Sequence, residues 1–364
     1  MTKRHVIFAI PFLFSVWTAK AQSDLTEKEQ RYKDSIDAVN AASKLTAEFQ
    51  EAYNSGNSNY ASKNYTAAIA AYEKALGLAP EFKEAWYNKG MAELSAKKFD
   101  DAIKSFSKLI TMDASNGKVY SQRGKAYMEK GDYKNAENDY MKAVKLAPKN
   151  ELARYNLGCV YFLMKEYPKA ITEFTNAINI KKDFAYAYND RGSCHRMLKN
   201  YTAAIADYDL AAKYNGRLAL ALTNLGWVKA KLKDYKGALE AYNRAISIDS
   251  KFHLAFNNRG AMFFEQGKLD DALADFNKTI ELKSTYAPAY NNRGSVKMKK
   301  KDYVGAEADF GKAIQLDANY ANAYVNRGYS REMIRDQAGA CQDWKKAREL
   351  GAELGKTYYV NDCN

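Results

Sequence analysis

Histidine is scarce in this chain, and the motifs of common catalytic sites are missing. The 364 residues include three histidines. Neither His195 nor His253 has a cysteine or a second histidine at the spacing of a zinc site. The sequence also lacks a phosphate-binding glycine loop and the GxSxG motif of serine hydrolases. These absences disfavour an enzyme, and the sequence predicts no metal and no cofactor.

Long apolar runs are rare too, and the one that stands out is N-terminal. Residues 6–17 form an apolar run that follows a basic start and precedes an alanine-lysine-alanine triplet. This order predicts a signal peptide over residues 1–21, cleaved before Gln22. A retained membrane anchor is the alternative, although the run is short for a membrane span. We expect an exported protein, periplasmic or extracellular, with no membrane span in its mature chain and a polar linker or N-terminal helix over residues 22–48.

A concentrated cluster of positive charge is missing as well. The chain has 56 Lys and Arg against 43 Asp and Glu, a formal net charge of +13, which favours acidic partners or anionic surfaces. The charges are spread along the chain, and the densest run is Lys299-Lys300-Lys301. Export and the lack of a basic arm disfavour nucleic acid as the main partner.

The sequence does contain a repeat with a period of 34 residues. Glycine recurs at this interval, followed after twelve residues by alanine and after sixteen by an aromatic residue. The glycines are Gly56, Gly90, Gly124, Gly158, Gly192, Gly226, Gly260, Gly294 and Gly328, and the aromatic residues are Tyr72, Phe106, Tyr140, Phe174, Tyr208, Tyr242, Phe276, Phe310 and Trp344. These columns divide residues 49–354 into nine repeats, in which we count the glycine as position 8.

The pattern resembles the tetratricopeptide repeat, and together with the signal peptide it resembles an exported bacterial type. The resemblance implies an all-α fold: a right-handed α-solenoid of nine 34-residue helix-turn-helix repeats, each with a helix A and a helix B, and a short C-terminal cap over residues 355–364. Glycine at position 8 and alanine at position 20 let the two helices cross closely. The aromatic residue at position 24 is expected to fill the wedge between neighbouring repeats.

The resemblance also implies a function. It predicts a non-catalytic scaffold for protein-protein interaction, in which the A helices line the concave face of the superhelix. We expect a protein or an extended peptide, of unknown identity, to bind this face as part of a cell-envelope assembly. The alternative, from another class, is an envelope protein that binds a carbohydrate or wall polymer through aromatic side chains and positive charge.

Asparagine recurs at position 6 and is interrupted by Gln122 and Asp190. The column consists of Asn54, Asn88, Asn156, Asn224, Asn258, Asn292 and Asn326. An amide both donates and accepts hydrogen bonds, so a row of amides can hold a peptide backbone, and this column resembles the asparagine ladders of other proteins of this family. Tyr155 and Trp227, at positions 5 and 9, are the predicted aromatic anchors. The alternative is that these asparagines cap helices, keep the surface soluble or form hydrogen bonds between A helices, without contacting a ligand.

Arginine at position 7 and aspartate at position 23 occur in the same five repeats. The pairs are Arg123 with Asp139, Arg191 with Asp207, Arg259 with Asp275, Arg293 with Asp309, and Arg327 with Asp343. In the other four repeats neither column holds these residues. This joint change predicts a structural salt bridge between helices A and B of one repeat. The alternative is that the arginines form a basic stripe that binds an acidic ligand.

The four cysteines of an exported chain invite disulfide pairing. Cys341 begins the last B helix and Cys363 lies just after the cap, so a disulfide between them would hold the end of the solenoid. Cys159 and Cys194 lie on adjacent A helices. Packed helix axes are about 8–10 Å apart, more than a disulfide allows between Cα atoms, so we expect this pair to stay reduced.

Overall fold

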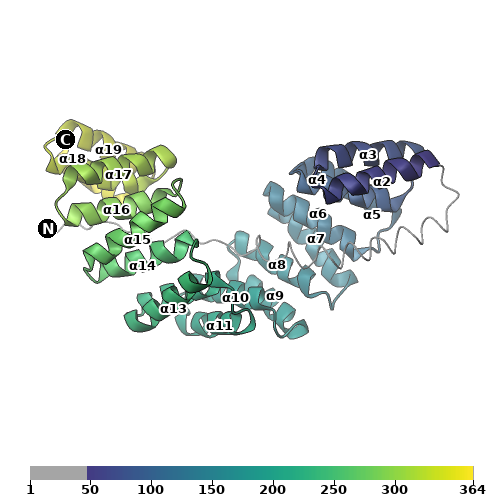
Figure 1. Ribbon diagram of the computed structural model, residues 1–364, viewed down its shortest axis with the longest axis horizontal. Helices are drawn as coiled ribbons and strands as arrows, with labels where there is room; N and C mark the ends of the chain where they lie inside the picture. The colour runs from purple at the N-terminus through teal and green to yellow at the C-terminus, as the bar shows by residue number, and fades with distance from the viewer. Residues whose placement is uncertain (1–46, 364) are drawn as a thin grey trace. The chain divides into compact units, whose positions relative to one another are not determined.

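The structure is a computed structural model and describes residues 47–363. The predicted signal peptide and nearly all of the predicted linker lie outside the described residues. In the part that is described, 19 helices form antiparallel helix-turn-helix repeats (Figure 1). None of the helices in this part is both long and apolar enough to cross a membrane.

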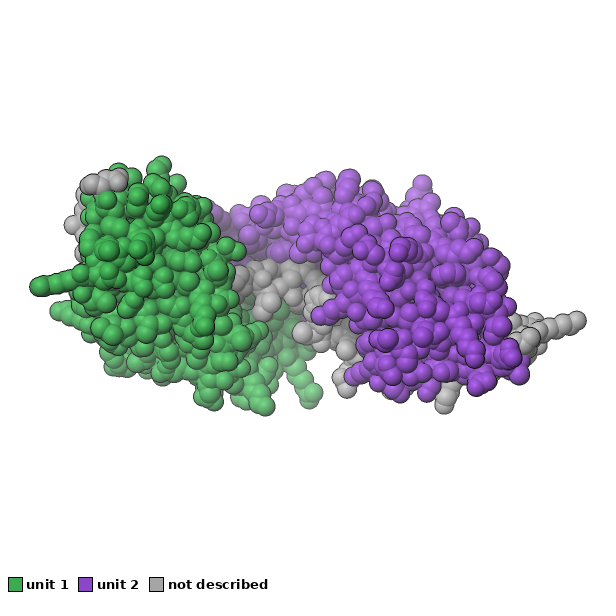
Figure 2. All heavy atoms as spheres, turned by 90° about the horizontal axis from the view of Figure 1, so that it is seen from above, with its two compact units in different colours: residues 1–13, 201–364 green, residues 14–200 purple. Residues whose placement is uncertain are grey.

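The described residues belong to two compact units, 47–200 and 201–363, which are treated separately (Figure 2). The first unit contains α2 (Ala47–Ala61), α3 (Tyr65–Leu78), α4 (Lys83–Ser95), α5 (Phe99–Met112), α6 (Gly117–Lys130), α7 (Tyr133–Leu146), α8 (Glu151–Leu163), α9 (Tyr167–Ile180) and α10 (Ala185–Met197). The second contains α11 (Tyr201–Tyr214), α12 (Ala219–Lys231), α13 (Tyr235–Ile248), α14 (His253–Glu265), α15 (Leu269–Leu282), α16 (Ala287–Lys299), α17 (Tyr303–Leu316), α18 (Ala321–Met333), α19 (Gln337–Glu349) and α20 (Glu353–Asp362). Even-numbered helices up to α18 are A helices and odd-numbered ones are B helices.

The turn from helix A to helix B has the same backbone form in every described repeat. Position 15 adopts a positive φ, and the residue is Lys63, Lys97, Gly131, Lys165, Lys199, Lys233, Gly267, Lys301 or Arg335. The following residue precedes helix B, and where it is aspartate its carboxylate caps the helix: Asp234, for example, accepts a hydrogen bond from the backbone N–H of Gly237 at 2.9 Å. Local sequence thus ends one helix and starts the next.

The core is built on the contact between the glycine at position 8 and the aromatic residue at position 24. A Cβ atom placed on Gly226 would lie 2.7 Å from Cε1 of Tyr242, and one on Gly260 would lie 2.9 Å from Cε1 of Phe276. These rings are almost fully buried, and Tyr242 also packs with Met262 of the next repeat. The aromatic column therefore fills the space within its own repeat and extends to the following one.

The C-terminal end of the stack is covered by α20. Its Tyr358 ring lies 5.3 Å from the Trp344 ring, and the guanidinium of Arg348 lies 4.5 Å from the Tyr359 ring. Cys341 and Cys363 form a disulfide with a Cα–Cα distance of 5.6 Å. The last repeat thus buries its outer face under a helix that is also covalently attached.

Candidate functional site

The candidate site is the surface of the A helices, which we call the A-helix face. Within each unit the A helices of successive repeats contact one another: α2 contacts α4, α4 contacts α6, α6 contacts α8 and α8 contacts α10, and likewise from α12 to α18. Equivalent positions therefore form rows that run from repeat to repeat. The resemblance to the tetratricopeptide repeat implies that this is the inner, concave side of the stack.

The asparagine row forms hydrogen bonds between neighbouring repeats. The amide Nδ2 of Asn292 donates to Oδ1 of Asn257 at 3.1 Å, and Nδ2 of Asn326 donates to Oδ1 of Asn291 at 2.9 Å. In the first unit Nδ2 of Asn88 donates to the hydroxyl of Tyr53 at 2.9 Å. In each case position 6 bonds to position 5 of the preceding repeat. These amides therefore have the structural role that the sequence left open as an alternative.

Exposure divides the asparagine row into two parts. Asn258, Asn292 and Asn326 are at most 5% exposed, so they offer a ligand very little surface. Asn54 is exposed, and Asn88, Asn156 and Asn224 are partly exposed. We therefore restrict the predicted ligand contact to these four amides, of which Asn88 is partly exposed while its Nδ2 donates to Tyr53.

The two predicted aromatic anchors have different surroundings. Tyr155 is buried: its hydroxyl donates to Oδ2 of Asp190 at 2.6 Å, and its ring lies 5.0 Å from the Phe184 ring. It packs in the core, which removes it as an accessible anchor. Trp227 is partly exposed, with its ring 6.5 Å from the Tyr201 ring and 5.7 Å from Nζ of Lys231.

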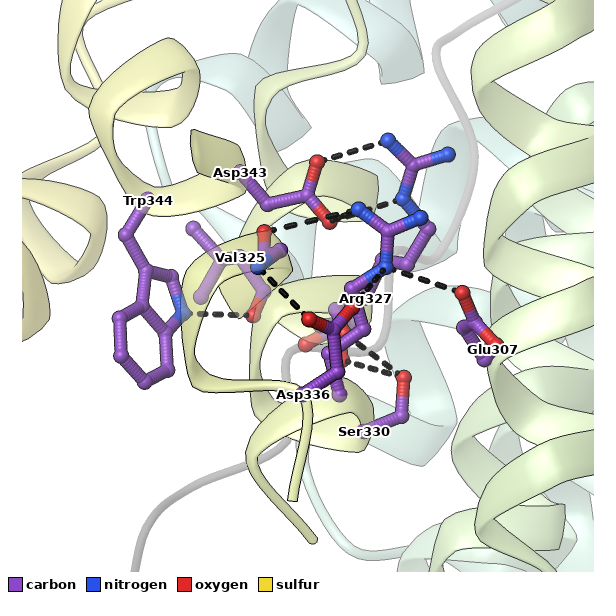
Figure 3. A network of polar contacts seen from close by, with 10 residues as sticks. Glu307, Val325, Arg327, Ser330, Asp336, Asp343 and Trp344 are labelled. Atoms are coloured by element: carbon purple, nitrogen blue, oxygen red, sulfur yellow. Dashed lines mark hydrogen bonds and ion pairs between the residues drawn. The ribbon is translucent and has the colours of Figure 1, made fainter. Parts of the chain in front are cut away.

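Four of the five predicted arginine-aspartate pairs lie within a single unit, and in all four the residues are in contact. The Nη2–Oδ1 distance is 2.7 Å in Arg123–Asp139, Arg259–Asp275, Arg293–Asp309 and Arg327–Asp343. Nε of each arginine donates a second, parallel hydrogen bond to the other carboxylate oxygen. Figure 3 shows this arrangement for Arg327 and Asp343. The fifth pair joins residues of different units and stays a prediction.

Four of the five position-7 arginines also donate a hydrogen bond to a residue of the preceding repeat. Nη1 of Arg259 donates to Oδ1 of Asn243 at 2.5 Å, and Nη1 of Arg293 donates to Oδ1 of Asn277 at 2.9 Å. Arg123 bonds in the same way to Ser107, and Arg191 to Thr175. The partner always stands at position 25, sixteen residues before the arginine. The sequence does not show this contact clearly, because at position 25 the polar Asp209 precedes Leu225 and Gly311 precedes Arg327.

Repeat two builds the same link with other residues. Nζ of Lys89 lies 3.2 Å from Oε1 of Glu73, at position 25 of the first repeat, and 3.1 Å from Oε1 of Glu93. The hydroxyl of Ser105, at position 23, donates to Oε2 of Glu93 at 2.7 Å. A cation at position 7 thus joins neighbouring repeats here too, so its role is structural.

Burial explains the perturbed pKa values of two side chains that could otherwise take part in chemistry, His253 and Cys159. Burial lowers the pKa of His253 to about 4, and it raises the pKa of the Cys159 thiol well above its usual value. Cys194 is also buried. Among the described residues no group of three or more His, Cys, Asp and Glu side chains is placed to hold a metal ion. The chemistry that the A-helix face offers is hydrogen bonding by amides and ring contact by Trp227.

Comparison with known proteins agrees with this geometry. Models of the tetratricopeptide repeat match residues 53–117, 152–184, 219–252 and 287–320, and a model of the TPR repeat matches residues 124–165 and 260–301. No curated protein matches the chain.

Several solved structures have a similar fold. A tetratricopeptide repeat protein from Parabacteroides merdae has a TM-score of 0.57 and 22% identity, over 68% of this chain and 99% of its own. The APC/C hetero-tetramer Cut9-Hcn1 has a TM-score of 0.58 and 16% identity, over 82% of this chain and 59% of its own. At these identities the likeness shows the fold alone. Together with the matched repeats and the helix pairs, it places this chain in the tetratricopeptide repeat family, whose members are generally non-catalytic scaffolds for protein-protein interaction.

Proposed function

We propose that this protein is an exported scaffold that binds a protein or an extended peptide on its A-helix face and works in a cell-envelope assembly. The observations that carry the proposal are the accessible amides of Asn54, Asn88 and Asn156 in the first unit and, in the second unit, the partly exposed amide of Asn224 with the partly exposed ring of Trp227 on the same helix. These groups lie on a face whose helices repeat regularly. Hydrogen-bond donors and acceptors that are regularly spaced along a surface can match a ligand whose own donors and acceptors are regularly spaced.

An extended polypeptide is such a ligand. It rises by about 3.3 Å per residue, and packed helices are about 8–10 Å apart, so amides in consecutive repeats, such as Asn54 and Asn88, would meet the peptide backbone about every three residues. Because an amide both donates and accepts, it can bond to a backbone N–H or C=O without selecting the side chain. Trp227 then supplies apolar contact area for one partner side chain.

Export supports a role in the envelope. The basic, apolar and small-residue order of residues 1–21 is the reason to expect translocation. Expression of the full chain in a bacterial host, followed by fractionation and N-terminal sequencing, tests this part. Export predicts a mature N-terminus at Gln22 in the exported fraction. A chain that stays in the cytosol with an intact N-terminus would contradict it.

Site-specific photocrosslinking tests the binding face. A photoreactive residue at Asn156 or at Trp227 should capture a polypeptide in cells, and mass spectrometry would identify it. The matched controls carry the same residue on B helices of the same units, at the exposed Met141 and Val304, and should capture far less. Equal capture from A and B helices would refute peptide binding on this face, and capture of glycan alone would favour the carbohydrate-binding alternative.

A further inference from the structure

Turns between helices A and B bear exposed cations at an unusual backbone position. In seven of the nine described turns the positive-φ residue is lysine or arginine, with φ between 60° and 67°. These residues are Lys63, Lys97, Lys165, Lys199, Lys233, Lys301 and Arg335, and all are exposed. The other two turns have glycine there, flanked by Lys130 and Lys268. Each described turn therefore carries a cation.

The backbone does not explain this choice. A residue with a Cβ atom pays an energetic penalty in the left-handed region, and glycine does not. Gly131 and Gly267 show that glycine fits the same turn in this stack. Lysine at position 15 thus has a conformational free-energy cost that glycine would avoid, and it adds a positive charge. This combination indicates that the charge has a function.

Apolar side chains are exposed beside these cations. Leu163, Met197, Leu198, Leu232, Met333 and Ile334 are between 36% and 50% exposed, and they account for half of the exposed large hydrophobic residues in the described chain. All six stand at positions 13 and 14, directly before the cation at position 15. In several turns, apolar residues are therefore followed by a basic residue, as in Met197-Leu198-Lys199.

Neighbouring turns lie side by side within each unit. In the first unit Nζ of Lys130 lies 2.6 Å from Oδ1 of Asp100, in the preceding repeat. In the second, Nζ of Lys231 lies 3.7 Å from Oε1 of Glu265, at the same position one repeat later. The turns of each unit therefore form one continuous edge, which we call the turn edge.

Cations outnumber acidic residues in several turns of the turn edge. Asp234, Asp302 and Asp336 follow the positive-φ residue and accept hydrogen bonds from backbone N–H groups at 2.9 Å as helix caps. The turn of the fifth repeat has Asn200 in this place and no acidic residue between Arg196 and Asn200. A capping aspartate keeps its negative charge, but the turns of the sixth and eighth repeats each have three exposed lysines around one aspartate: Lys231, Lys233 and Lys236 with Asp234, and Lys299, Lys300 and Lys301 with Asp302. These turns and that of the fifth repeat therefore keep an excess of positive charge.

We propose that the turn edge docks on the surface of an anionic lipid bilayer. Cations attract the negative headgroups, and apolar side chains beside them insert at the boundary between headgroups and acyl chains. A soluble anionic polymer would use the cations and would leave the apolar side chains in water, so the combination favours a bilayer. Docking goes beyond the proposed peptide binding, since it uses a different surface of the repeats.

Flotation with lipid vesicles tests the proposal on the full chain. One variant combines Lys199→Gly, Lys233→Gly and Lys301→Gly, which removes three charges and relieves the backbone. Since each cation near an anionic surface contributes about 1 kcal/mol, we expect roughly a 100-fold loss of affinity for vesicles of phosphatidylcholine with phosphatidylglycerol. Vesicles of pure phosphatidylcholine should show no difference. The N-terminal residues are the same in all variants, so the difference reports the turn edge.

Two further variants decide the outcome. The charge-matched control combines Lys74→Gln, Lys142→Gln and Lys345→Gln, at exposed sites on B helices, and should bind nearly as the parent chain does. A variant with Leu198→Ser, Leu232→Ser and Ile334→Ser should bind more weakly, with a loss that persists at high salt. Equal losses in the control and the turn variant would overturn the proposal. So would unchanged binding of the serine variant together with full displacement by a soluble anionic polysaccharide.

Discussion

The guanidinium of Arg259 donates two parallel hydrogen bonds to the carboxylate of Asp275, at 2.8 and 2.7 Å, and a third to Asn243 of the preceding repeat. Asp275 is 5% exposed, and burial raises its pKa above the usual value although Arg259 acts in the opposite direction. The arginine is therefore a structural cross-link between three helices. Its charge compensates a carboxylate that the fold has removed from water.

Removing the arginine alone should be costly. In Arg259→Leu the Asp275 carboxylate remains buried without its partner, and the free energy of unfolding should fall by about 3–5 kcal/mol. Chemical denaturation near pH 7 measures this. The loss should be smaller near pH 4, because a carboxyl group whose folded-state pKa is raised is better tolerated once it is protonated.

The double variant Arg259→Leu/Asp275→Ala is the matched control. It copies repeat six, where Leu225 and Ala241 hold these positions and are both buried. We expect it to recover most of the lost stability. A double variant as unstable as the sum of Arg259→Leu and Asp275→Ala would show that the two positions are not coupled.

Replacing the glycine at position 8 should disturb the core. In Gly226→Ala the new methyl group meets Tyr242 at 2.7 Å, so the helices must move apart, at a cost of about 1–3 kcal/mol. Gly77→Ala is the control, because a Cβ atom there has no neighbour within 4 Å. Thermal denaturation should show destabilisation for Gly226→Ala alone, whereas equal effects would refute the close contact.

His253 should make stability depend on pH. Burial lowers its pKa from 6.5 to about 4, so between these values the unfolded chain binds a proton that the folded protein does not. The free energy of unfolding should therefore fall as the pH is lowered from about 6.5 to about 4. In His253→Gln this contribution should vanish from denaturant midpoints measured across the range, and an identical slope in both proteins would contradict it.

Glycine in place of a turn lysine should stabilise the fold. Lys233 has a φ of 65°, and relief of this conformation in Lys233→Gly should add up to about 1 kcal/mol. The reverse change, Gly267→Lys at a φ of 75°, should destabilise by a similar amount. A stability loss in Lys233→Gly would mean that the lysine side chain makes a stabilising contact.

The disulfide should hold the terminal helix. In the chain-entropy account, closing a loop of this length stabilises a protein by about 3 kcal/mol, so Cys363→Ser should expose α20 first. Hydrogen exchange should show faster exchange in α20 and little change in α12 and α14. Peptide mapping without reduction should recover Cys341 linked to Cys363, and finding both alkylated would refute the bond.

The sequence by itself determined the architecture. Nine copies of one 34-residue unit sample the same environment nine times, so a glycine, an alanine and an aromatic column reveal which positions are buried. The same redundancy showed that Arg259 and Asp275 change together, which identified a contact within one repeat. Turn chemistry is local too, and the cap at Asp234 could be read from neighbouring residues.

The tertiary structure decided what happens between repeats. Asn292 bonds to Asn257 and Tyr155 bonds to Asp190, each across a separation of 35 residues. These side chains therefore face the neighbouring repeat, although the sequence predicted that both contact a ligand. The link from Arg259 back to Asn243 likewise joins two repeats. A column read within one repeat cannot show such contacts, because they depend on how one repeat packs on the next.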